Sequence, residues 1–107
     1  MSKSVYILQA ELFKTLSHPL RVKTIDLLRE GELCFREILE HTGGLKSSLS
    51  QHLAILVNIG ILKVRKDSRC NYYKLTSPKV VKLCALVREI LSDNLQKNLN
   101  TLAVSLR

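Results

Sequence analysis

The side chains best suited to chemistry in this 107-residue sequence form two polar clusters. The first is the segment KSSLSQ, which starts at Lys46 and offers short hydroxyl and amide groups that can approach the base edges of nucleic acid. The second runs from Lys63 to Lys74 and holds five basic side chains, interrupted only by the acidic Asp67. Cations at this density suit phosphate groups. Together, the clusters favour a polyanionic partner.

Catalytic motifs are missing from the sequence. There is no HExxH motif and no phosphate-binding glycine loop, since Gly43-Gly44 is expected to form a turn. The carboxylate-rich segment Asp26–Glu40 is expected to be helical surface. The sequence also offers no plausible pair of a catalytic nucleophile and a general base. We therefore expect neither an enzyme nor a bound cofactor.

Composition and charge describe a small basic domain. The formal net charge is +8, of which residues 55–107 contribute +7, and such an excess suits nucleic acid or an acidic membrane face. No apolar run approaches the ~18 residues of a membrane span, and the start lacks a signal-peptide pattern. Three cysteines without paired spacing argue against a secreted disulfide scaffold. We expect one cytoplasmic domain over residues 1–107, with no membrane association.

The elements that must position these clusters follow from periodicity and from helix-ending residues. The pattern predicts a mainly α fold with a small β-hairpin. The expected helices cover 4–16, Pro19 to Gly31, a short helix that starts at a Cys34–Glu37 capping box, 46–59 and 79–107; the expected strands cover 61–65 and 71–75.

The first and last of these helices carry more apolar surface than one small core can cover. Leucines recur along residues 79–107, and apolar side chains also line residues 4–16. We expect residues 1–16 and 79–107 to bury this second stripe against another copy of the chain.

The segments LSHPLR, GELCFREI, SSLSQHL, GIL and YYKL occur in this order between residues 10 and 77. This series resembles the ArsR/SmtB family of transcriptional repressors. The resemblance implies a winged helix-turn-helix, with the helix-turn-helix at 35–59 and the wing at 61–75. It also implies a homodimer that binds a palindromic operator in double-stranded DNA.

The expected DNA contacts fall into two groups. The recognition helix would contribute the residues Lys46, Ser47, Ser48, Ser50, Gln51 and His52. The wing would contribute Lys63, Arg65, Lys66 and Arg69, which are expected to meet phosphates or the minor groove.

The metal sites known in this family are not reproduced here. One such site needs a Cys-x-Cys pair, and this chain has Cys34-Phe35-Arg36. Another needs histidine on the last helix, and residues 78–107 contain none. No metal site is therefore assigned, although a site using Cys84 and a ligand from a second copy stays open.

Two alternatives remain for regulation, namely a thiol switch or a repressor without a small inducer. For a switch, Cys34 is expected to react first, because a helix N-terminus lowers the pKa of a thiol. Cys84 is the candidate second thiol, although its apolar surroundings should raise its pKa. Cys70 would place any adduct near DNA. The alternative function for the whole chain is a winged-helix protein-interaction module without DNA readout.

Overall fold

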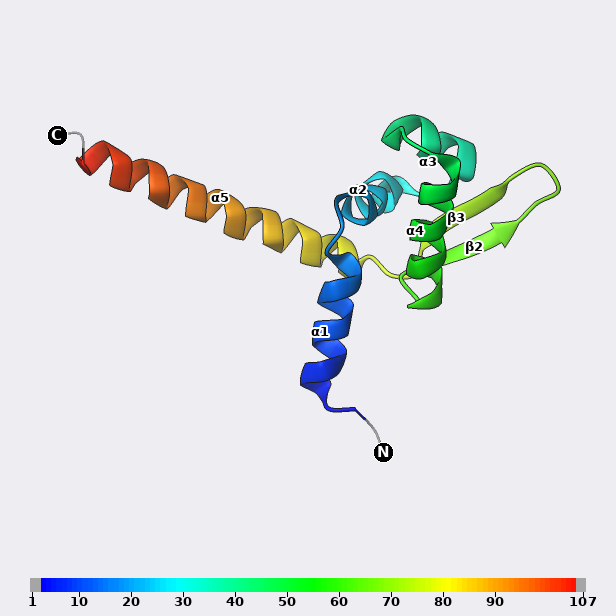
Figure 1. Cartoon of the computed structure of the whole chain (residues 1–107), viewed down its shortest axis with the longest axis horizontal. Coiled ribbons are helices and arrows are strands. Elements are labelled where there is room, and N and C mark those ends of the chain that lie inside the picture. Colours follow the sequence, from blue (N-terminus) through cyan, green and yellow to red (C-terminus); the bar gives the residue numbers. More distant parts are fainter. Residues whose placement is uncertain (1–2, 106–107) are drawn as a thin grey trace.

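Five α-helices and a small sheet make up residues 3–105, the part of the chain that the computed structural model describes (Figure 1). The helices are α1 (Val5–Leu16), α2 (Pro19–Leu27), α3 (Phe35–Thr42), α4 (Lys46–Asn58) and α5 (Lys79–Ser105), and a 3₁₀ turn covers Leu28–Glu30. The strands are β1 (Leu33–Cys34), β2 (Leu62–Lys66) and β3 (Asn71–Leu75). The mainly α fold with a β-hairpin is confirmed; residues 106–107 of the expected last helix lie outside the described part.

Local capping explains where the first helices begin. The Ser4 hydroxyl accepts a hydrogen bond from the backbone N–H of Ile7 at the start of α1. At the start of α2, Nδ1 of His18 accepts from the N–H of Leu20, and Pro19 occupies the first helical position, where its missing N–H is not needed.

The predicted capping box at the start of α3 is confirmed. The backbone N–H of Cys34 donates to Oε1 of Glu37 at 3.1 Å, while the Cys34 sulfur faces the N–H of Glu37 in return. At the other end of the helix-turn-helix, α4 stops before Gly60, as expected, and Gly60 continues the chain with a φ of +88°.

The sheet has one strand more than the sequence pattern predicts. Its order is β1-β3-β2, and both pairs are antiparallel. Residues Leu33 and Cys34 pair with Tyr73 and Tyr72. As a result, the two-residue β1 joins the start of α3 to the hairpin that follows α4.

One apolar core holds the helix-turn-helix together. Its fully buried side chains come from α2, the 3₁₀ turn, α3, α4 and β2, and contact between them fixes α4 against the body of the domain. The core residues below 3% exposure are Ile25, Leu28, Ile38, Leu49, Leu53, Leu56 and Leu62. Tyr73 of β3 is also buried.

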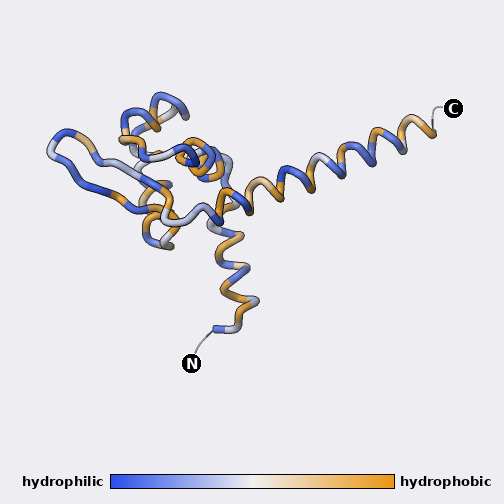
Figure 2. The backbone as a smooth tube through the Cα atoms, turned by 180° about the vertical axis from the view of Figure 1, so that it is seen from behind, coloured by the Kyte–Doolittle hydropathy of each residue, from blue (hydrophilic) through white to orange (hydrophobic). Residues whose placement is uncertain are grey.

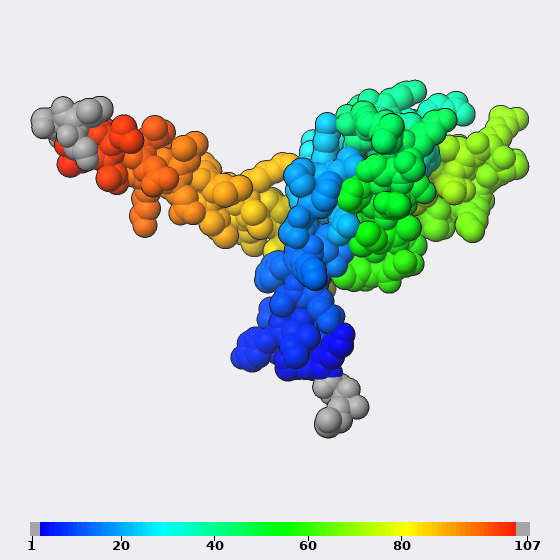
Figure 3. Space-filling view, viewed as in Figure 1, coloured from blue at the N-terminus to red at the C-terminus, as the bar shows by residue number. Residues whose placement is uncertain are grey.

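Helices α1 and α5 project away from this core as two arms (Figures 1 and 3). Apolar residues recur along both arms in Figure 2. On α5 the exposed apolar side chains include Ile90, Leu91, Leu95, Leu99 and Leu102, each more than half exposed. This is the unburied stripe that the sequence predicts. No helix within residues 3–105 combines the length and apolarity needed to cross a membrane.

Candidate nucleic-acid interface

Helix α4 separates an apolar face from a polar edge near its N-terminus. Leu49, Leu53 and Leu56 are fully buried, which orients the whole helix. The exposed positions of its first two turns are Lys46, Ser47, Ser50 and Gln51. Short polar side chains on an exposed helix edge are what a groove of DNA requires, because they let the backbone approach the base edges.

Two of the expected contact residues on α4 are less accessible than the others. Ser48 and His52 are half-buried and lie one turn apart, on the side of α4 that turns toward the rest of the domain. The polar edge of α4 is therefore carried by the other four residues.

The His52 ring is held by α2. Nδ1 of His52 accepts a hydrogen bond from Nε of Arg21 at 3.0 Å, and the His18 ring lies 4.1 Å away, centroid to centroid. Because Nδ1 is an acceptor, the neutral ring carries its proton on Nε2. Burial of the ring, followed by the charges of His18 and Arg21, lowers the pKa of His52. One nitrogen of His52 is thus already committed to Arg21, leaving Nε2 for an outside partner.

The wing presents different residues on its two faces. Lys66 and Asn71 face each other across the hairpin and share the α4 side with the buried Tyr73. Side chains alternate along a strand, so Lys63 and Arg65 lie on the opposite side. The expected wing contacts are therefore divided between two faces.

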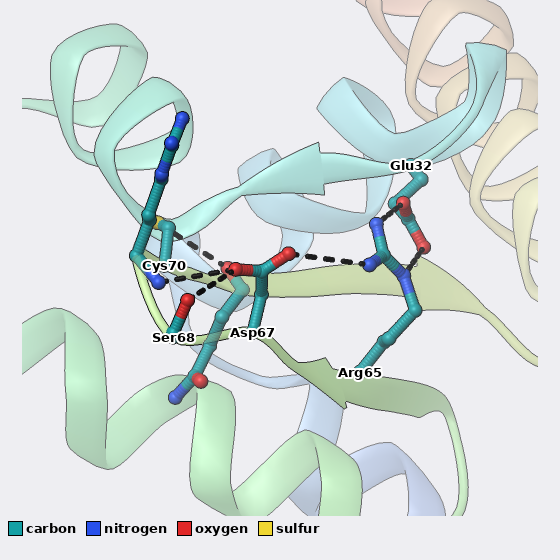
Figure 4. A network of polar contacts seen from close by, with 7 residues as sticks. Glu32, Arg65, Asp67, Ser68 and Cys70 are labelled. Atoms are coloured by element: carbon teal, nitrogen blue, oxygen red, sulfur yellow. Dashed lines mark hydrogen bonds and ion pairs between the residues drawn. The ribbon is translucent and has the colours of Figure 1, made fainter.

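Arg65 is engaged within the protein. Its guanidinium donates to both carboxylate oxygens of Glu32, with the shorter bond 2.7 Å long (Figure 4). It also lies 4.2 Å from the centre of the Tyr72 ring. Hydrogen bonding to Arg65 lowers the pKa of Glu32 below its ordinary value. Because this pair is largely exposed, it contributes little to stability, but it reduces the charge that Arg65 offers to DNA.

The tip of the wing is shaped by Asp67. Its Oδ1 accepts from the backbone N–H of Arg69 at 3.1 Å and from the Ser68 hydroxyl at 3.4 Å (Figure 4). Within the described chain, no ion pair holds the side chains of Arg69 or Lys66, and both are exposed. These two cations are the available charges at the tip and on the α4 side of the wing.

A cleft of about 200 Å³ lies between α4 and the wing. Ser50 and Asn58 of α4 line one wall, and Lys66 and Asn71 of the hairpin line the other. The polar edge of α4 and the α4 side of the wing therefore belong to one continuous surface.

The expectation that the pKa of Cys34 is lowered is wrong. The N–H of Glu37 does lower it, but burial, the Glu37 carboxylate and Cys70 together raise the pKa above its ordinary value. The thiol whose pKa is lowered is Cys70, chiefly because the N–H of Arg36 stabilises its thiolate. The first two amides of α3, those of Phe35 and Arg36, thus act on Cys70, and only the amide of Glu37 acts on Cys34.

Cys84 lies apart from this region, on α5. It lines an apolar groove of about 380 Å³ with Phe13, Val22 and Leu91. Burial raises the pKa of Cys84, as expected. Across residues 3–105, no three His, Cys, Asp or Glu side chains gather closely enough to hold a metal ion.

The sequence analysis did not identify Arg21 and Glu32. Arg21 positions His52, and Glu32 positions Arg65. Arg21 stands 31 positions from His52, and Glu32 stands 33 positions from Arg65. Charge complementarity alone cannot select these partners among the seventeen basic and nine acidic side chains.

Comparison with known proteins links this geometry to regulators of transcription. Residues 18–64 match the family model described as bacterial regulatory protein, arsR family. The HTH-type transcriptional regulator Rv0081 of Mycobacterium tuberculosis is 38% identical over 92 residues, which is 85% of this chain and 81% of that protein. Its crystal structure superposes with a TM-score of 0.81 and covers 92% of this chain and 99% of that one, at 34% identity.

A second solved structure bears on assembly. It is the solution structure of a homodimeric winged helix-turn-helix DNA-binding domain from Mycobacterium bovis. It matches with a TM-score of 0.74 at 27% identity, over 91% of this chain and 93% of that one.

Proposed function

This chain belongs to the arsR family of bacterial regulatory proteins, and from that premise we propose that it represses transcription by binding a palindromic operator as a homodimer. The family and the relatives are transcriptional regulators, not enzymes. The observation that carries the proposal is the continuous surface formed by the exposed edge of α4 and the α4 side of the wing.

In the proposed complex, α4 enters the major groove. Ser47, Ser50 and Gln51 are exposed and short enough to hydrogen-bond base edges, and Lys46 stands at the start of the helix, where it would meet a phosphate. Lys66 and Arg69 would contact the neighbouring backbone from the wing. Base contacts would then provide the sequence preference, while the wing would provide affinity that depends on salt.

The homodimer is supported by the uncovered apolar surface of the two arms. A second copy would bury the leucine stripe of α5 together with the groove between α1 and α5, which Phe13 and Leu91 line. A two-fold dimer of this kind places two α4 helices at half-sites about 34 Å apart, one turn of DNA.

The test is selection of operator sequences from a random duplex library, followed by footprinting of the chain on the selected DNA. We expect an inverted repeat with half-sites separated by about one helical turn. A selected site without two-fold symmetry would contradict the proposed dimeric readout.

A titration with salt separates DNA binding from the alternative of a protein-interaction module. The affinity of a DNA-binding protein for random duplex DNA falls steeply as salt rises, because each phosphate contact releases counterions. If the chain does not bind random DNA, or binds it with an affinity that does not change with salt, the interaction module is favoured.

The signal that releases the repressor from its operator is a separate part of the proposal. Release could follow from a thiol switch, or the repressor could act without a small inducer. An operator-release assay with thiol oxidants, polysulfide, arsenite and divalent metals distinguishes these two cases from a metal response.

A further inference from the structure

Cys34 and Cys70 lie side by side although they are far apart in the sequence. Cys34 faces Tyr72 across the β1–β3 pair, and Cys70 stands two residues before Tyr72. Cys70 comes directly before β3, so the alternation of side chains along the strand places it on the side of Tyr72, diagonal to Cys34 at the end of the sheet. Both are free and half-buried, and each thiol shifts the pKa of the other, so the two sulfurs lie close together. The Cys70 thiol itself donates a hydrogen bond to the carbonyl oxygen of Asn71, at 3.6 Å.

The two thiols have unequal surroundings. The Cys70 sulfur lies against the backbone N–H groups of Arg36 and Phe35, at the first turn of α3, and near the positive charge of Arg36. These groups, together with the Cys34 thiol, lower the pKa of Cys70. The pKa of Cys34 is raised, because burial, Glu37 and Cys70 outweigh the N–H of Glu37. Cys70 is therefore the nucleophile of the pair, and Cys34 is the protonated partner.

We propose that Cys34 and Cys70 form a dithiol site at which a hydroperoxide produces an intramolecular disulfide between the start of α3 and the base of the wing. The observation behind it is the placement of two free cysteines as neighbours, on separate segments, next to helix amides that stabilise an anion. Neither the arsR family membership nor the DNA-binding surface is needed for this inference.

The chemistry proceeds in two balanced steps. The Cys70 thiolate attacks the peroxide ROOH, the O–O bond breaks, and Cys70 becomes a sulfenic acid while RO⁻ takes a proton and leaves as ROH. The Cys34 sulfur then attacks the Cys70 sulfur, the S–O bond breaks, and the departing hydroxide takes the Cys34 proton to give water. Overall, two thiols lose two electrons and two protons, and the peroxide is reduced to ROH and water.

The disulfide would change the local geometry. Two neighbouring sulfurs must close to about 2.0 Å when they bond. Diagonal neighbours in a sheet have Cα atoms about 7–8 Å apart, which exceeds the usual disulfide spacing. Bond formation therefore draws the base of the wing toward α3.

The sequence provides a direct assay, because trypsin separates the three cysteines. They fall on the peptides 30–36, 70–74 and 83–88, which contain Cys34, Cys70 and Cys84. The full chain is treated with hydrogen peroxide, alkylated without reduction, digested and analysed by mass spectrometry. We expect peptides 30–36 and 70–74 to appear as one linked species that has lost two hydrogens, while peptide 83–88 stays alkylated.

Three variants test the roles of the thiols. Cys34→Ser removes the second thiol, so we expect a Cys70 sulfenic acid that the reagent dimedone captures. Cys70→Ser should leave Cys34 reduced under the same treatment. Cys84→Ser is the matched control and should form the linked peptide as the parent chain does.

Several results would overturn the proposal. These are a linkage that involves peptide 83–88, a linkage between two chains instead of within one, and alkylation of all three cysteines after peroxide treatment. The mapping on the parent chain decides these outcomes even if a serine variant fails to fold.

Discussion

Arg21 of α2 donates from Nε to Nδ1 of His52 at 3.0 Å, and this bond ties α4 to the body of the domain. The same guanidinium donates to the carbonyl oxygen of Thr15 at the end of α1, 2.9 Å away. One side chain thus connects α1, α2 and α4. Any tilt of α4 must either carry Arg21 with it or break one of these bonds.

Lowering the pH should weaken this connection. Burial, His18 and Arg21 lower the pKa of His52 in the folded chain, so the unfolded chain binds a proton at His52 more readily. The resulting stability is fully present above the ordinary pKa of 6.5 and is lost as pH falls through the lower folded value. A protonated ring also has no acceptor left for Arg21.

The measurement is urea unfolding at several pH values from about 7.5 to about 5. We expect the parent chain to lose stability more steeply over this range than His52→Gln, because glutamine does not titrate. His41→Gln removes an exposed histidine and should leave the slope as steep as in the parent. Equal slopes for the parent and His52→Gln would contradict the assignment.

Removing the base contacts on α4 should cost specificity. Ser47→Ala and Gln51→Ala should each weaken operator binding by roughly 1–3 kcal/mol and leave binding to random DNA almost unchanged. Competition titrations with both DNAs measure the difference. If Gln51→Ala weakened both DNAs equally, the residues at the start of α4 would not be the ones that contact bases.

The two faces of the wing should differ in their contribution to DNA binding. Lys66→Ala removes a cation from the α4 side and should weaken operator and random DNA alike, with the salt slope reduced by about one. Lys63→Ala is the matched control from the opposite face and should leave the slope unchanged. A larger effect for Lys63 would show that the wing meets DNA through its other face.

The two wing arginines should also differ. Arg69 is exposed at the tip without an ion pair in the described chain, whereas Arg65 is bound by Glu32. We expect Arg69→Ala to reduce affinity for random DNA more than Arg65→Ala does. The variant Glu32→Gln provides a check, because it releases Arg65 without moving it from the face opposite α4, so we expect that affinity to change little. A clear rise in affinity for Glu32→Gln would show that the Arg65 face of the wing also meets DNA.

Charges on the α5 stripe should separate the proposed dimer. Leu91 and Leu95 are 62% and 60% exposed in one chain, so replacing both with Glu disturbs little of its own core. We expect monomers by analytical ultracentrifugation and loss of operator binding. Lys97→Glu adds a negative charge about half a helical turn away from Leu95 and should stay dimeric. A parent chain that is monomeric at micromolar concentration would contradict the proposal.

Most of the fold is predictable because its elements are periodic. The leucine spacing of α4 and the alternation in β2 and β3 each extend over at least five residues, which is enough to show a period. Strand β1 has only two residues and shows none. It exists because Cys34 and Leu33 find partners on β3, and such a tertiary pairing has no local signal.

The polar edge of α4 is predictable for the same reason, since the burial of Leu49 determines which neighbours are exposed. The partners that each side chain meets in the folded chain cannot be predicted in this way, as the two thiols Cys34 and Cys70 illustrate. The sequence places Cys34 at the start of α3, where the helix amides should stabilise its thiolate. In the folded chain the amides of Phe35 and Arg36 instead meet Cys70, which arrives from the hairpin.

The uncovered length of α5 has a consequence for how such a repressor would respond to its own abundance. If only the dimer binds the operator, then well below the dissociation constant of the dimer its amount rises with the square of the chain concentration. Halving the supply of protein would then remove about three-quarters of the DNA-binding species. Growth and division alone would relieve repression in a cell that stops making the protein, with no effector molecule involved.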